Sequence, residues 1–88
     1  MPFDFPSHTT SSTPRAVQRE EVVSLLAEGL GRPSAEELVR AAALTLRLAG
    51  LSWTLAEALD VLDRVADIPG RTGVAALFAK TRLILEHH

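Results

Sequence analysis

The sequence predicts an all-α protein: a compact bundle of four short helices preceded by an extended N-terminal arm. Three observations lead to this prediction. Hydrophobic residues make up 47% of the chain and are mostly Ala, Leu and Val, with no Tyr and a single Trp, and an Ala- and Leu-rich composition favours helices over strands. Apolar residues recur at helical spacing through most of the chain. Residues that start and end helices separate these segments.

Residues 1–13 form the expected arm. Pro, Ser and Thr are frequent there, and neither helical nor strand spacing is present, which favours an extended segment. Phe3 and Phe5 are exceptions, because two aromatic side chains in an arm are candidate anchors for a groove on the same or another subunit. A disordered leader is the alternative interpretation of the same composition.

The first helix is expected at about residues 14–30. Thr13 can cap its start, and Pro14 suits the first helical position. Gly31 can end it in a left-handed conformation. One face of this helix is apolar and is formed by Val22, Leu25, Leu26 and Leu30.

The second helix is expected at about residues 34–49. Ser34 followed by Glu37 is a capping-box pattern, and Gly50 is the expected end. Leu44 and Leu48 lie outside the main apolar stripe and widen it around the helix. A helix that is apolar over so much of its circumference is expected to be central in the fold or to form an interface.

The third helix is expected at about residues 55–67 and is cleanly amphipathic. Thr54 and Glu57 repeat the capping-box pattern. Trp53 precedes the cap, so it either closes the corner between two helices or serves as an interface anchor.

The fourth helix is expected at about residues 74–84, after a segment interrupted by Pro69, Gly70 and Gly73. It has two apolar faces. The larger side chains align as Val74, Leu77, Phe78, Thr81 and Ile84. The second face is mostly small and contains Ala75, Ala76, Ala79 and Leu83. Because small side chains permit close approach, this second face is expected to pack either inside the bundle or against a second subunit.

Residues 85–88 have the sequence of the start of a Leu-Glu-polyhistidine tag, and we expect them to be an expression-tag remnant. Heavy use of Ala, Leu and Arg, with Lys80 as the only Lys, indicates a bacterial protein from a GC-rich genome. No signal peptide and no apolar run of membrane-spanning length is present. The expected location is therefore the cytoplasm.

Catalytic chemistry is not expected. The chain has no Cys, which excludes disulfides, thiolate nucleophiles and Cys-based zinc sites. The carboxylates lie on predicted solvent faces beside Arg residues, and no shielded acid–base pair is apparent. Arg71 in the Gly70–Gly73 segment could contact a phosphate, but the segment lacks the Walker spacing and is interpreted as a turn. We expect no enzyme activity, no metal and no cofactor.

The sequence therefore predicts a small protein-interaction module that forms a homodimer or binds another protein. The candidate interface residues are Leu44, Leu48, Trp53, Leu83, Phe3 and Phe5. A helix-turn-helix regulator is the first alternative, because the second and third helices have suitable lengths. Nucleic acid is not expected as a partner, since the net charge is −2 and the third helix presents acidic residues. A small-ligand carrier, which needs a closed cavity, is the second alternative.

Overall fold

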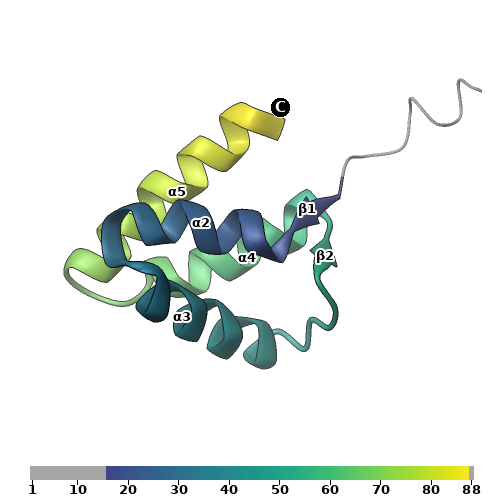
Figure 1. Cartoon of the computed structure of the whole chain (residues 1–88), viewed down its shortest axis with the longest axis horizontal. Helices are drawn as coiled ribbons and strands as arrows, with labels where there is room; N and C mark the ends of the chain where they lie inside the picture. Colours follow the sequence, from purple (N-terminus) through teal and green to yellow (C-terminus); the bar gives the residue numbers. More distant parts are fainter. Residues whose placement is uncertain (1–15, 88) are drawn as a thin grey trace, which may run out of the picture.

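The computed structural model describes residues 16–87 and shows four helices and two very short strands in this range (Figure 1). It confirms the predicted all-α bundle. The expected arm, including Phe3 and Phe5, lies outside the described residues. The elements are β1 (Val17–Gln18), α2 (Arg19–Leu30), α3 (Arg32–Thr45), β2 (Ser52–Trp53), α4 (Leu55–Ala66) and α5 (Arg71–His87).

Helix α2 packs against both α3 and α5, and α4 packs against α5 and α3. The core between them is aliphatic, as the composition indicates, with Trp53 as its one aromatic member in the described range. The largest fully buried side chains are Leu26, Leu62, Leu83, Val17, Val22, Val39, Val61 and Val65. None of the helices in residues 16–87 combines the length and apolar character that crossing a bilayer requires.

The two strands were not predicted. They pair antiparallel, with Val17 opposite Trp53 and Gln18 opposite Ser52, and the Arg19 N–H donates to the Leu51 carbonyl oxygen at 2.8 Å. This pairing holds the chain extended before α2, so that helix begins at Arg19 and not near residue 14 as expected. Burial of both Val17 and Trp53 gives the extended conformation its stabilising contacts.

One of the two predicted capping boxes is confirmed. The Thr54 hydroxyl accepts from the Glu57 N–H at 3.0 Å, and the Glu57 carboxylate accepts from the Thr54 N–H at 2.9 Å. The prediction at Ser34 was wrong, because α3 begins at Arg32 directly after Gly31. Gly31 has φ 84° and reverses the chain alone, so two helices follow each other across a single residue.

The predicted end of α3 at Gly50 was also wrong. The helix ends at Thr45, and Arg47 adopts φ 61° in the turn that follows. The Leu48 N–H donates to the Ala43 carbonyl oxygen at 2.9 Å, which satisfies one of the free carbonyls at the helix end. The chain leaves the helix early because residues 52–53 must reach β1 in an extended conformation.

Helix α5 begins at Arg71, earlier than residue 74, and includes Gly73. Gly73 is buried against the turn after α4, where a Cβ atom would clash with the carbonyl oxygens of Ile68 and Ala66. The helix continues through His87, whose Nε2 lies 2.7 Å from Oε2 of Glu21. The segment expected to be a tag remnant therefore continues α5 as far as the described residues reach.

Candidate interaction surfaces

Helix α5 buries its small-residue face. Gly73, Ala76, Ala79 and Leu83 are its buried residues, and Leu83 is 0% exposed. Leu83 was predicted as an interface residue because it lies apart from the larger side chains. This prediction was wrong, because its side chain is buried within its own subunit. Small side chains let the α5 backbone approach α2 and α4 closely, so the core closes around this face.

The larger apolar side chains of α5 face solvent. We call Val74, Leu77, Phe78 and Ile84 the outer stripe. All four are exposed, Phe78 to 70% and Leu77 to 54%. Leu85 is exposed as well but belongs to the segment expected to be a tag remnant. Contiguous exposed apolar side chains of this kind mark interaction sites on soluble proteins.

Thr81 lies on the same side of α5 as the residues of the outer stripe and does not interrupt its apolar character. Its hydroxyl donates to the Leu77 carbonyl oxygen at 3.0 Å, inside the same helix. A hydroxyl bonded in this way needs no hydrogen bond from water when the surface is covered. The stripe can therefore be buried along its length without stranding a polar group at its centre.

A hollow of about 290 Å³ lies beside Phe78, between α2 and α5. Its floor is formed where Gly29 faces Ala75, since a Cβ atom on Gly29 would approach the Ala75 Cβ to 3.1 Å. The ion pair between Glu28 and Arg82, 2.8 Å long, contributes to its lining. The same face of the molecule thus carries an exposed aromatic side chain and an adjacent hollow whose lining is partly apolar and partly charged.

The other predicted interface residues have different environments. Leu44 on α3 is 71% exposed, and Leu48 is partly buried against the core. Trp53 is only 3% exposed, as expected of a residue that closes the corner before α4. Its Nε1 has no hydrogen-bond partner within residues 16–87. Of these three, only Leu44 presents most of its surface to solvent.

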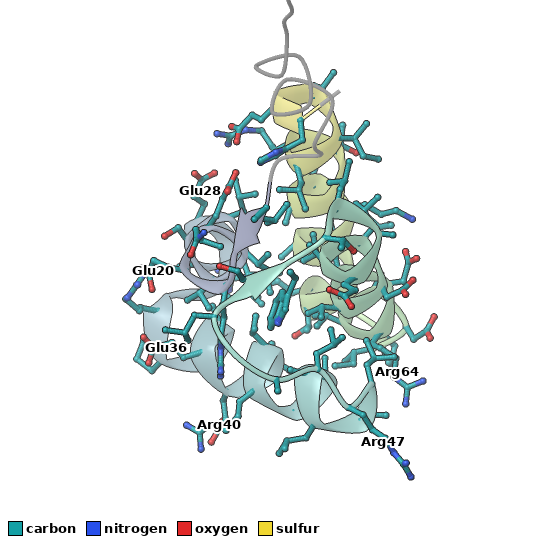
Figure 2. All side chains as sticks on the ribbon, turned by 90° about the vertical axis from the view of Figure 1, so that its right-hand side faces the viewer. Glu20, Glu28, Glu36, Arg40, Arg47 and Arg64 are labelled. Atoms are coloured by element: carbon teal, nitrogen blue, oxygen red, sulfur yellow. The ribbon has the colours of Figure 1, made fainter. Side chains whose placement is uncertain are left out.

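Charged side chains lie on the outside of α3 and α4, beside exposed Leu44 on α3. Arg40, Arg47 and Arg64 point outward along one edge of the molecule (Figure 2). The solvent face of α4 nevertheless carries Asp60 and Asp63. This is the face that a helix-turn-helix protein would present to DNA, and its acidity opposes contact with phosphates.

Arg71, which the sequence placed in a possible phosphate-binding turn, is used by the fold. Its guanidinium donates to the Gly29 carbonyl oxygen at 3.1 Å, near the end of α2. This contact ties the start of α5 to α2. The residues after Gly70 are helical and do not form an open loop around an anion.

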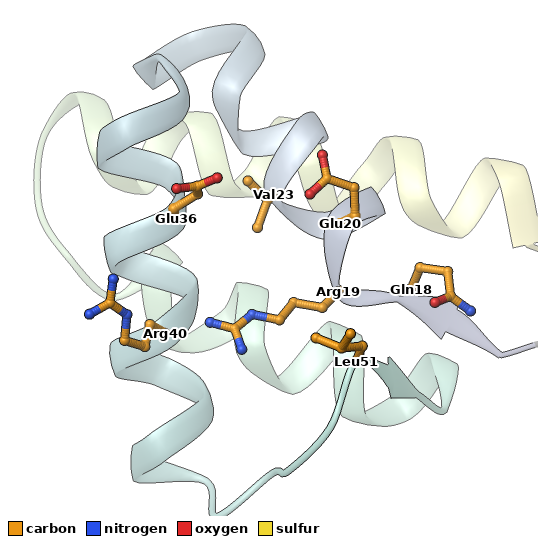
Figure 3. Close-up of a pocket in the computed structure, with 7 residues that line it drawn as sticks. All are labelled: Gln18, Arg19, Glu20, Val23, Glu36, Arg40 and Leu51. Carbon is orange, nitrogen blue, oxygen red and sulfur yellow. The ribbon is translucent and has the colours of Figure 1, made fainter.

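A second pocket, of about 340 Å³, was not anticipated from the sequence. Figure 3 shows the residues that line it: Gln18, Arg19, Glu20, Val23, Glu36, Arg40 and Leu51. They come from the end of β1, from the first half of α2, from α3 and from the loop before β2, which the pairing of β1 and β2 brings together. Helical periodicity contains no signal for such a site, because it depends on contacts between distant segments.

No family model, no curated protein and no solved structure matches this chain. Within residues 16–87, the acidic and histidine side chains form no group of three or more that could hold a metal ion.

Proposed function

We propose that this chain is a non-catalytic protein-interaction module that forms a homodimer through the outer stripe of α5. The observation that carries the proposal is the orientation of this helix: it buries its small side chains and leaves Leu77 and Phe78 in solvent. Covering large apolar side chains is favourable by about 25 cal/mol per Å². A second copy of the chain would cover these side chains without a different partner.

A twofold dimer needs a surface that complements itself, and a protruding side chain beside a hollow on the same face supports such a dimer. Phe78 protrudes, and the hollow beside it is lined by Ala75, Ala79 and Arg82, within about one turn of Phe78 on the same helix. Two α5 helices packed antiparallel would each place Phe78 in the partner's hollow. Aromatic side chains in fully desolvated pockets are typical centres of binding energy.

The non-catalytic part of the proposal is supported by the exposure of the titratable side chains. Among residues 16–87, the shielded pair of His87 with Glu21 involves the segment expected to be a tag remnant, and the side chains of the other ion pairs are about one third or more exposed. General acid–base catalysis depends on titratable groups held in a shielded environment. We also propose a bacterial cytoplasmic location, which the Arg-rich, Cys-free composition supports.

Neither alternative function is favoured by a specific observation. The acidic solvent face of α4 opposes DNA binding. A ligand carrier is not favoured either, because the two hollows described above are lined largely by exposed residues such as Arg40 and Phe78. A protein partner other than a second copy would use the same stripe, and the experiment below separates it from a homodimer.

The test is the mass of the particle in solution, measured by sedimentation equilibrium across micromolar concentrations. The wild-type chain is expected to reach the mass of a dimer. Phe78→Glu is expected to be a monomer, because its carboxylate would have to be desolvated in the partner's hollow. A wild-type mass that stays monomeric at every concentration overturns the homodimer.

Two control variants locate the interface. Leu51→Glu changes a side chain that is 68% exposed but lies outside α5, so the dimer is expected to persist. Leu44→Glu probes the exposed residue on α3 that the sequence singled out. If Leu44→Glu dissociates the dimer and Phe78→Glu does not, the interface lies on α3. This result would overturn the assignment to α5.

A further inference from the structure

The pocket between α2, α3 and the loop before β2 has two different ends. Arg19 extends from the start of α2 toward α3, where Arg40 stands, while Glu20 and Glu36 lie on the other side of the pocket (Figure 3). Val23, which is buried, contributes the apolar part of the lining together with exposed Leu51. Cationic, acidic and apolar surfaces therefore meet in a volume of about 340 Å³.

The two carboxylates of the pocket are already used by a third arginine. Arg32 forms ion pairs with Glu20 and with Glu36, the latter at 3.5 Å. Among residues 16–87, no ion pair involves Arg19 or Arg40. Within the described range, the two arginines of the pocket thus have no paired carboxylate, whereas the two carboxylates of its acidic end share the single positive charge of Arg32.

We propose that this pocket binds a carboxylate side chain of a partner protein, with an apolar residue next to that carboxylate in the partner's sequence. The guanidinium of Arg19 would contact the carboxylate oxygens, and that of Arg40, which points outward in this structure, would reach them after a change of its side-chain rotamer. The neighbouring apolar side chain would cover Leu51, which is otherwise exposed. The proposal goes beyond the dimer, because no residue of the pocket belongs to α5.

The apolar part of the lining favours a peptide carboxylate over an inorganic anion. Charge alone does not separate a carboxylate from a phosphate, because both are attracted by Arg19 and Arg40 and repelled by Glu20 and Glu36. An inorganic anion cannot cover Leu51, whereas a peptide can. An acidic residue beside Leu or Val in an extended segment meets both requirements.

The proposal is tested with the isotope-labelled full chain and two blocked tetrapeptides in an NMR titration. The probes are acetyl-Ala-Asp-Leu-Ala-amide and the same peptide with Asn in place of Asp. The backbone signals of Val23 and Leu51 are expected to shift saturably with the Asp peptide, and the Asn peptide is expected to bind about tenfold more weakly. Equal binding of the two peptides, or no saturable shift with either, overturns the proposal.

Variants and a competing anion complete the test. Arg19→Gln and Arg40→Gln are each expected to weaken binding of the Asp peptide about tenfold, whereas Arg64→Gln, an exposed arginine outside the pocket, is expected to leave it unchanged. Inorganic phosphate that binds more tightly than the Asp peptide overturns the choice of a carboxylate. Binding is expected to persist in Phe78→Glu, so the dimer and this pocket can fail independently of each other.

Discussion

Replacing Leu83 and Leu77 by Ala tests the orientation of α5 directly. Both are leucines on the same helix, but Leu83 is 0% exposed and Leu77 is 54% exposed. Leu→Ala removes three carbon atoms in each case, so any difference between the two variants reports their environments and not their chemistry.

The magnitudes follow from this burial. Each buried carbon group contributes about 0.8 kcal/mol, so Leu83→Ala loses about 2.4 kcal/mol of transfer free energy. The cavity left in a closed core raises the loss to about 3–4 kcal/mol. Leu77 is less than half buried in the subunit and leaves no closed cavity, so Leu77→Ala is expected to lose about 1 kcal/mol.

The assay is urea unfolding followed by circular dichroism, with both substitutions made in the Phe78→Glu background. This background removes the proposed dimer, whose contacts would otherwise add concentration-dependent stability at Leu77. The free energy of unfolding is expected to fall by about 2–3 kcal/mol more for Leu83→Ala than for Leu77→Ala. Equal losses, or a larger loss for Leu77→Ala, would show that α5 faces the core with its larger side chains.

Three further outcomes are expected. Thr54→Ala removes the capping-box hydroxyl and should lower the free energy of unfolding, measured in urea, by about 1 kcal/mol. Ser34 makes no cap contact, so Ser34→Ala should lower it far less. Gly73→Ala should lower the melting temperature despite the better helix propensity of Ala, because its Cβ would clash with the Ile68 carbonyl; a rise would contradict this packing. The fluorescence of Trp53 should resist acrylamide quenching until the chain unfolds, and strong quenching of the native protein would show that this residue is exposed.

Local signals in the sequence predicted the helical class and much of its detail. The amphipathic pattern of residues 55–67 placed Ala58, Leu62 and Val65 toward the core, where they are buried. The Thr54–Glu57 capping box formed as expected. These features depend on interactions within one or two helical turns, so nearby residues are sufficient to specify them.

The same local signals failed where a distant segment competes. Ser34 has the residues of a cap, but α3 begins at Arg32 because Gly31 already reverses the chain. The first helix does not begin near residue 14 as expected, because Val17 pairs with Trp53, a residue far away in the sequence. The pocket around Arg19 and Arg40 arises from this pairing, and for that reason no local pattern in the sequence indicates it.

The sequence by itself determined that this chain forms amphipathic helices and approximately where each one lies. Only the tertiary structure decided which of the two apolar faces of α5 is buried. Both faces satisfy helical periodicity, but the space between α2 and α4 accommodates the small side chains around Ala76 and Ala79 and leaves Phe78 outside. The position of the candidate interaction surface therefore depends on the volume between neighbouring helices, which is a property of the assembled fold.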